Sequence, residues 1–253
     1  IAEVESHGQR PIPVIRDAAH CAPHGAGREA RLADFTAYSF QAIKFVTCGD
    51  GGALVTPNEF VERARLLRWY GLDRATNRDR STQRITEAGY KWHMNDIAAS
   101  IGLANLELGM REDRLLIPAR GPLGERRRTA AFYYSKLWPH VRGETRPQSR
   151  LLAIPTASDR DALDHDWWLY TIHVEDRDRF VAFAKRRGVE CSLVHVRNDY
   201  HPVFDGPARP AKLPGVDFFA KHQVAIPIGS HLDAEKREVV ANTVIDWAEG
   251  ADR

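Results

Sequence analysis

Short apolar runs and longer amphipathic segments alternate along the chain. Residues 11–16 form an apolar run after a turn, which predicts a buried strand. In residues 34–40 aromatic positions alternate with small or hydroxyl-bearing ones, as is typical of a strand. A glycine-rich turn at residues 48–52 leads into a third predicted strand at residues 52–56. The pattern therefore predicts consecutive strands joined by loops before the first long helix.

The next segment, residues 56–71, has the pattern of an amphipathic helix. Thr56 is its expected N-cap, Pro57 fits the first helical position, and Glu59 would complete a capping box. Gly71 is expected to end the helix, because glycine adopts the left-handed conformation that follows many helices. One face is apolar and is expected to be buried: Phe60, Ala64 and Leu67.

A second helix is predicted after a polar loop at residues 72–86. Asn95 is its expected N-cap. Its expected buried face consists of Ile97, Ile101, Ala104 and Leu108. The pattern breaks at residues 117–124, where prolines and glycines exclude a continuous helix, and helical periodicity resumes at residues 125–137.

A smaller unit is predicted from about residue 150 onward. It would contain a strand at residues 167–174, a helix ending at Gly188 and a strand at residues 189–196. The last predicted helix, residues 232–250, has Asp233 as its expected N-cap. Its apolar stripe comprises Val240, Val244 and Trp247.

Strands that alternate with helices predict an α/β fold. We expect a large domain at residues 1–130, and a small C-terminal α/β domain with a linking helix at residues 131–253. The chain begins with Ile, and its first residues read as the end of a helix followed by a turn. We therefore expect an N-terminal part of the large domain to be missing from this chain.

Composition narrows the function classes. Hydrophobic residues make up 43% of the 253 residues and charged residues 28%, and the net charge of +2 predicts neither nucleic-acid nor membrane binding. No apolar run is long enough to span a bilayer, and no signal peptide is recognisable. The three cysteines, Cys21, Cys48 and Cys191, are far apart and form no metal-binding motif. A cytoplasmic protein without a bound metal is therefore expected.

Four polar residues lie within one short stretch near the predicted strand ends. Asp17 follows the first strand, His20 comes three residues later, Ser39 ends the second strand, and Lys44 precedes the glycine turn. Each one alone has an ordinary explanation as a turn, loop, strand or surface residue. Together they match the needs of pyridoxal 5′-phosphate (PLP): an amine for the aldehyde, a carboxylate for the pyridine nitrogen and a hydroxyl for the phosphate.

Longer motifs add a family resemblance. The stretches "VIRDAAHCAPHGAG", "DFTAYSFQAIKFVTCGDGGALVT", "LLRWYGLDR" and "GYKWHMNDIAASIGLANL" resemble, in this order, motifs of the DegT/StrS family of sugar aminotransferases. The segments "VHVRNDYHPVF" and "VAIPIG" resemble its C-terminal part. The family implies the PLP-dependent fold type I, whose large domain holds a mixed, mainly parallel sheet. Residues 109–125 depart from the family pattern, and their role stays open.

The resemblance assigns roles to the four residues. It implies that Lys44 is the catalytic lysine that links covalently to PLP, and that Asp17 is the partner of the pyridine nitrogen. His20 would contact the phenolic oxygen of the ring, and Ser39 would bind the phosphate. The family has a long N-terminal region that carries further PLP contacts, so we expect this chain alone to be poorly active.

Another implied contact crosses a homodimer interface. The family sends a polar residue from the segment that matches "GYKWHM" to the phosphate in the partner subunit. Lys91 and His93 lie two positions apart in this segment, so in an extended chain they face the same way. Either residue is a candidate, and the alternative is that both only pack at an interface.

The C-terminal motif "VHVRND" supplies candidate substrate ligands. It contains His195, Arg197 and Asn198, and the fork of Arg197 suits a diphosphate or a carboxylate. A structural salt bridge from Arg197 to Asp199 is the equal alternative.

The function implied by the resemblance is a PLP-dependent transfer of an amino group. The donor would be an amino acid, expected to be glutamate, and the acceptor a keto-sugar, expected to be nucleotide-linked. A PLP-dependent sugar dehydratase of the same fold is the first alternative, although Lys44 argues against it, because some of those enzymes carry histidine there. The other alternative is an inactive fragment or an interaction subunit.

Overall fold

The structure is a computed structural model. It describes residues 12–23, 33–74, 79, 81–110, 122–155, 165–204 and 212–251. The chain forms two compact units, residues 1–115 and residues 116–253, and each is described by itself. The expected division after residue 130 falls inside a helix of the second unit, so the observed division lies before this helix rather than within it.

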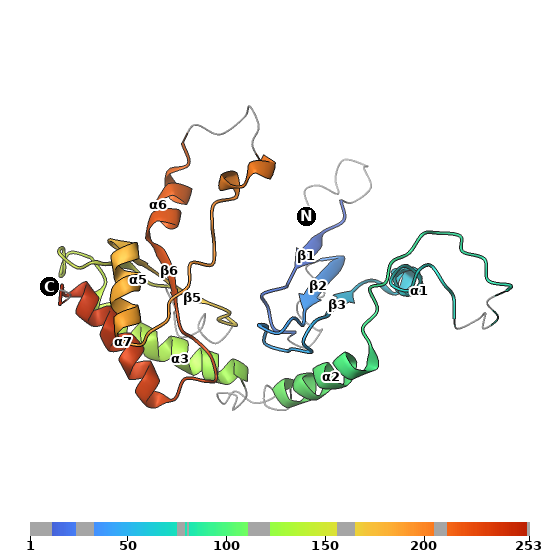
Figure 1. The fold of residues 1–253 in the computed structure, drawn as a ribbon, viewed down its shortest axis with the longest axis horizontal. Coiled ribbons are helices and arrows are strands. Elements are labelled where there is room, and N and C mark those ends of the chain that lie inside the picture. The colour runs from blue at the N-terminus through green and yellow to red at the C-terminus, as the bar shows by residue number, and fades with distance from the viewer. Residues whose placement is uncertain are drawn as a thin grey trace. The chain divides into compact units, whose positions relative to one another are not determined.

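The first unit is built on a mixed three-stranded sheet (Figure 1). Strand β1 (Ile15–Asp17) pairs in parallel with β2 (Phe35–Ser39), which pairs antiparallel with β3 (Gly52–Val55). The second and third predicted strands are confirmed to within a residue. The first one was placed too early, because residues 12–14 lie outside the sheet and pairing with β2 begins at Ile15.

Helix α1 (Asn58–Leu67) follows β3. The predicted capping box is wrong: the N-cap is Pro57, which makes no side-chain cap bond, and the buried hydroxyl of Thr56 has no partner among the described residues. The expected buried face is also wrong, because α1 has no buried residue, although the ring of Phe60 contacts that of Phe35 in β2 at 5.4 Å. Gly71 adopts a φ of 75° after the helix, as predicted for a helix terminator.

Helix α2 (Asp96–Met110) begins as predicted, since the side chain of Asn95 accepts a hydrogen bond from the N–H of Ala98 at 2.9 Å. Its predicted buried face is wrong. Ile97 and Ile101 are 77% and 47% exposed, whereas Gly102 is buried. The side chain of the predicted core residue Leu108 lies outside the described part.

The isoleucines of α2 are exposed because the helix packs its small and polar residues, rather than its large apolar ones, against the loop between β2 and β3. A Cβ on Gly102 would sit 3.1 Å from Cβ of Cys48, which is tighter than most such contacts, so glycine favours this close approach. The side-chain amide of Asn105 donates a hydrogen bond to the carbonyl of Thr47 at 2.7 Å. These contacts fix the loop that carries Lys44.

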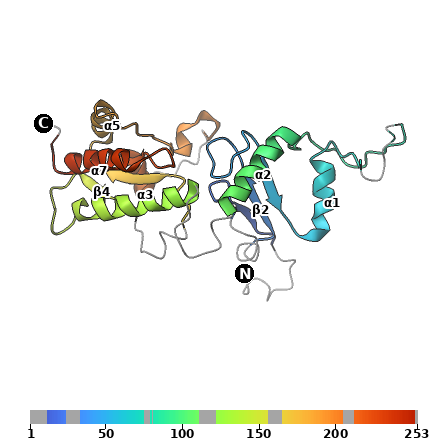
Figure 2. The ribbon, with the colours of Figure 1, turned by 90° about the horizontal axis from the view of Figure 1, so that it is seen from below.

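The second unit is a three-stranded antiparallel sheet with helices packed on it (Figures 1 and 2). Its strands are β4 (Leu151–Ala153), β5 (Tyr170–Val174) and β6 (Gln223–Ile226), in that spatial order. Its helices are α3 (Pro122–Leu137), α5 (Arg177–Arg186), α6 (Pro214–His222) and α7 (Ala234–Ala248). Short 3₁₀ turns occupy Trp138–His140, Asn198–Tyr200 and Pro202–Phe204.

One continuous hydrophobic core joins the sheet of this unit to α3, α5 and α7. Its largest fully buried side chains include Tyr133, Leu151, Tyr170, Phe180 and Trp247. Alternate residues of β5 are fully buried, as expected for a strand with one face on a core. The surface side chains of this unit are therefore supported by a continuous packed core.

Three sequence predictions can be checked in this unit. The final helix is confirmed with its cap, because the side chain of Asp233 accepts a hydrogen bond from the N–H of Lys236 at 2.8 Å. The helix before Gly188 is confirmed, and this glycine has a φ of 75°. The strand predicted at residues 189–196 is wrong, because only Ser192 forms a bridge, to Ala225 of β6.

Candidate functional site

The predicted PLP ligands lie at one edge of the sheet in the first unit. Because β1 and β2 are parallel, their carboxyl ends meet at the same edge, where antiparallel β3 begins. Asp17 is the last residue of β1, and Ser39, paired with Gly52, is the last residue of β2. His20 lies in the turn directly after β1. The fold thus brings Asp17, His20 and Ser39 to one edge, as the sequence suggested.

The carboxylate of Asp17 is oriented by the turn that follows β1. Its Oδ1 accepts a hydrogen bond from the N–H of Ala19 at 2.9 Å, while the side chain stays exposed. The N–H of fully buried Ala18 donates to the carbonyl of Ala37 in β2 at 2.8 Å. The backbone is therefore held to the sheet next to a carboxylate that is open to a ligand.

Lys44 lies in the closed loop between β2 and β3. The N–H of Phe40 donates to Gly51 at 2.8 Å and the N–H of Cys48 donates to Phe40 at 2.9 Å, which closes the base of the loop. The side chain of Lys44 is half-buried, and this burial lowers its pKa from the ordinary lysine value, whereas the charge of Asp17 acts in the opposite direction. Asp17 and Lys44 therefore act on each other electrostatically within one unit.

Ser39 presents its hydroxyl at the same edge. Its Oγ accepts a long hydrogen bond of 3.4 Å from the N–H of Gln41, which leaves the hydroxyl hydrogen to donate elsewhere. An amine of lowered pKa, a carboxylate and a hydroxyl donor are the groups that PLP requires. On this chemistry Lys44, Asp17 and Ser39 fit the group.

The segment with Lys91 and His93 lies against the end of α1. The N–H of Trp92 donates to the carbonyl of Arg68 at 2.9 Å, and Lys91 forms an isolated bridge with Trp69. Lys91 and His93 both line a cavity of about 380 Å³ beside the turn at Gly51. Both side chains therefore reach one space, and the contact of either with a partner subunit stays a prediction.

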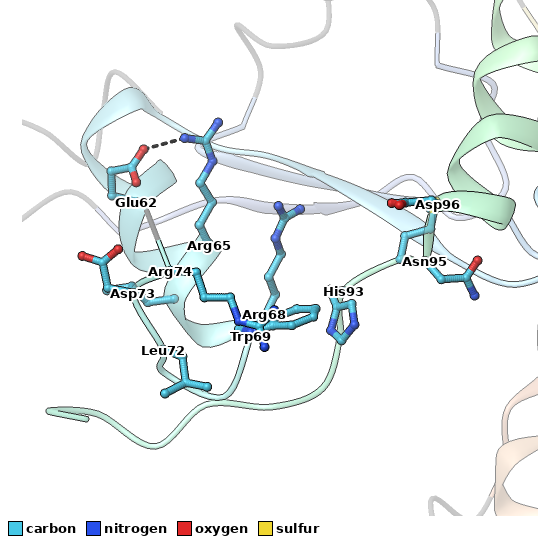
Figure 3. A pocket seen from close by; sticks show the side chains of 12 residues that line it. Glu62, Arg65, Arg68, Trp69, Leu72, Asp73, Arg74, His93, Asn95 and Asp96 are labelled. Carbon is cyan, nitrogen blue, oxygen red and sulfur yellow. Dashed lines mark hydrogen bonds and ion pairs between the residues drawn. The ribbon is translucent and has the colours of Figure 1, made fainter. Parts of the chain in front are cut away.

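A larger cavity of about 680 Å³ borders the other side of His93 (Figure 3). The ring of Trp69 lies between the guanidinium of Arg74, at 4.3 Å, and the ring of His93, at 3.5 Å. Desolvation, and then the positive charges of Lys91, Arg68 and Arg74, lower the pKa of His93. The lowered pKa favours the neutral form of His93 near neutral pH.

The C-terminal candidates are held by ion pairs. Arg197 binds Asp199 through two hydrogen bonds of 2.8 and 2.6 Å and also binds Asp217. The hydrogen bonds to Asp199 are the main cause that raises the pKa of Arg197. Of the two readings of this residue, the structure shows the salt bridge. Sequence reasoning missed Asp217 because it lies twenty positions away in α6, in no shared motif.

His195 and Asn198 are close to Arg197 in the sequence and are both exposed. His195 is exposed and lines a cavity in the second unit together with Arg197, whereas Asn198 begins the 3₁₀ turn that contains Tyr200. Their roles as substrate ligands stay predictions.

A model of the DegT/DnrJ/EryC1/StrS aminotransferase family matches residues 5–245. The chain belongs to this family. It is 30% identical over 261 residues to a dTDP-3-amino-3,4,6-trideoxy-alpha-D-glucose transaminase of Streptomyces venezuelae, covering 98% of this chain and 59% of that protein. The chain therefore spans about three-fifths of this DegT/DnrJ/EryC1/StrS relative.

Solved structures described as sugar aminotransferases share the fold. The sugar aminotransferase CalS13 of Micromonospora echinospora has a TM-score of 0.73 and 28% identity, covering 97% of this chain and 61% of that one. The putative sugar aminotransferase Spr1654 of Streptococcus pneumoniae, in a structure described as the PMP form, has a TM-score of 0.70 and 21% identity, covering 94% and 57%. The predicted α/β fold of fold type I is confirmed.

Two features are absent from the described residues. Within the ranges that the structure describes, no helix is both long and apolar enough to cross a membrane. The same ranges contain no group of three or more histidine, cysteine, aspartate or glutamate side chains placed to hold a metal ion.

Proposed function

We propose that this protein is the part of a PLP-dependent sugar aminotransferase that carries the catalytic lysine. The donor would be an amino acid, glutamate by the family resemblance, and the acceptor a nucleotide-linked keto-sugar. The protein would act as a homodimer with shared active sites. It would be located in the cytoplasm. The observation that supports it is that Asp17 and Ser39 end two parallel strands at one sheet edge, and that Lys44, in the loop after Ser39, is acted on by the charge of Asp17.

Each of these residues has a defined task in the proposed reaction. Bound PLP would supply an electron-withdrawing ring that accepts the electron pair released at the α-carbon of the donor. Nζ of Lys44 would hold the cofactor and then, as a free amine, take the proton from that α-carbon. The carboxylate of Asp17 would keep the proton on the pyridine nitrogen, and the hydroxyl of Ser39 would donate to the phosphate.

The lowered pKa of Lys44 supports this assignment. Only the neutral amine can act as a nucleophile or a base, and burial increases its fraction at neutral pH. His20, in the turn beside Asp17, is the proposed contact of the phenolic oxygen.

For the contact across the dimer we favour Lys91 over His93. The ring of His93 is packed on Trp69 and its pKa is lowered, so it offers no charge to a phosphate near neutral pH. The side chain of Lys91 is exposed and borders the cavity at the glycine turn. A phosphate of the partner subunit would therefore meet the ammonium of Lys91.

The decisive experiment replaces the lysine. The full-length protein, rather than this chain alone, is incubated with PLP and glutamate, and 2-oxoglutarate is measured in a single turnover. We expect Lys44→Ala to lose the half-reaction by more than about a thousandfold, because both the covalent link and the base are removed. Lys185→Ala, an exposed lysine in the last turn of α5, is the matched control and should behave as wild type.

Two results would contradict the proposal. If Lys44→Ala formed 2-oxoglutarate at the wild-type rate, Lys44 would not be the catalytic lysine. If the full-length wild-type protein with bound PLP released no 2-oxoglutarate from glutamate, a dehydratase or a non-catalytic role would be favoured instead.

A further inference from the structure

A cavity of about 370 Å³ in the second unit lies where α6 passes into β6. Its lining includes His195, Arg197, Lys221 and Gln223. All of them belong to one compact unit whose core is continuous, so the cavity is a property of that unit by itself.

Gln223 is the unusual member of this lining. It is only 2% exposed, and its Nε2 donates a hydrogen bond to the carbonyl of His195 at 3.0 Å. A carbonyl can only accept, so this bond fixes which end of the amide is the nitrogen. The other end, Oε1, is buried and has no hydrogen-bond partner among the described residues. A buried acceptor left unpaired is costly, so a ligand that donates to Oε1 would regain that energy.

Of the described cationic side chains around Gln223, Arg177 and Arg197 form ion pairs and Lys221 does not. Arg197 is matched by Asp199 and Asp217. Arg177 binds Asp178 and also donates to the carbonyl of Ala220 at the end of α6. It therefore links α5 to α6 beside the cavity. Lys221 is exposed and forms no ion pair with a described carboxylate.

Among the described residues that line the cavity, Gln223 therefore has one buried acceptor without a partner, and Lys221 is the one cation without an ion pair. Asp217, on its wall, disfavours a bare anion that has nothing else to bind. A ligand that places a hydroxyl on Oε1 of Gln223 and an anionic group near Lys221 satisfies both, and a sugar phosphate has this combination of groups.

We propose that this cavity binds the sugar-phosphate portion of a ligand, with Gln223 accepting a bond from a sugar hydroxyl and Lys221 meeting the phosphate. This inference rests on the proposed function for the class of ligand, a sugar phosphate, and adds two residues that lie outside the motifs. Arg197 then holds the loop of His195 in place rather than binding the substrate directly.

The test is equilibrium binding, which needs neither PLP nor turnover. Calorimetric titration of the whole chain with glucose 1-phosphate, glucose and inorganic phosphate compares the two groups separately and together. We expect glucose 1-phosphate to bind at least about tenfold more tightly than either glucose or phosphate. This comparison uses the wild-type protein and so does not depend on the folding of a variant.

Two variants then assign the residues. Gln223→Met keeps the approximate side-chain length but removes both the acceptor and the N–H that donates to His195, and we expect it to weaken binding of glucose 1-phosphate about five- to tenfold. Lys221→Gln should weaken glucose 1-phosphate and phosphate by a similar factor and flatten the salt dependence of binding. Lys185→Gln is the control for a lost surface charge, and circular dichroism checks the fold of each variant.

The proposal is overturned if glucose 1-phosphate binds no better than phosphate, or if a folded Gln223→Met variant binds it as wild type. The glutamate half-reaction is independent of this measurement. A protein that binds the sugar phosphate but fails with glutamate refutes the proposed transamination alone, and one that transaminates without this binding refutes the cavity alone.

Discussion

At the scale of single residues, Lys44 shows two opposing influences on one amine. Partial burial disfavours its ammonium and lowers the pKa, while the negative charge of Asp17 favours the ammonium and raises it. Desolvation is the stronger of the two, so the pKa of Lys44 lies below the ordinary lysine value. The same carboxylate that would serve the pyridine ring thus limits how far the amine is activated before the cofactor arrives.

Asp17→Asn should therefore lower the pKa of Lys44 further. Removing the charge removes the influence that stabilises the ammonium, so the neutral amine appears at lower pH. The pH midpoint of modification of Lys44 by trinitrobenzenesulfonate, followed by mass spectrometry, should move downward. Asp50→Asn is the control, since Asp50 acts on Cys48. An upward shift in Asp17→Asn would contradict the described electrostatics.

Part of this site could be predicted from the sequence and part could not. Asp17, Ser39 and Lys44 stand at strand ends and a glycine turn, and local patterns locate such positions. The contacts of Gln223 and Asp217 are made with residues far away in the sequence. Sequence spacing therefore could not predict them. Of the two carboxylates that bind Arg197, Asp199 could be predicted because it lies two positions away, but Asp217 could not.

At the scale of elements, Gly71 follows α1 and lies close to residue 87, just before the segment that carries Lys91. Its φ is 75°, and a Cβ there would lie 2.2 Å from the carbonyl oxygen of Glu87. Only glycine fits both the conformation and the space.

Gly71→Ala should destabilise the first unit by about 1–3 kcal/mol, because the backbone is strained and must also move away from Glu87. Urea unfolding followed by tryptophan fluorescence measures the change. Gly143→Ala, with nothing within 4 Å of the added carbon, should change stability by less than about 0.5 kcal/mol. Equal stabilities of the two variants would refute this account of the turn.

Element types were more predictable than their buried faces. The caps of α2 and α7 follow from side chains next to the helix, so Asn95 and Asp233 were found. The failed capping box at Thr56 shows that a neighbouring proline can shift the start of a helix. The failed strand at residues 189–196 has the right residues for a strand, yet it meets β6 at a single bridge.

At the scale of the molecule, the two units differ in how well they cover their apolar residues. The second unit has a continuous buried core, whereas the first exposes Ile15, Ile97 and Leu103 on its sheet and on α2. Large exposed apolar side chains that gather on one element mark surfaces for association. This agrees with the proposed homodimer and explains why the apolar stripe of α2 was wrongly predicted to lie inside.

Ile97→Asp should therefore reduce self-association. The charge would have to be buried in any interface that covers this face of α2, at a cost of several kcal/mol unless it finds a partner. Light scattering coupled to size exclusion, over a range of concentrations, gives the mass. Glu107→Gln, on the same helix, is the control and should leave the mass unchanged. An unaltered mass in Ile97→Asp would exclude this face from the contact.

The loop that carries Lys44 also contains Cys48, and the packing of this residue has a consequence for chemical labelling. Its thiol is buried and donates to the carbonyl of Asp50 at 3.2 Å, and burial raises its pKa. Burial likewise raises the pKa of Cys191 to about 12. Reaction with a maleimide needs the thiolate, so Cys21, which directly follows His20, should be labelled first. Peptide mapping after brief labelling would show this, and the chain then carries its own attachment point for a fluorophore beside the proposed PLP site.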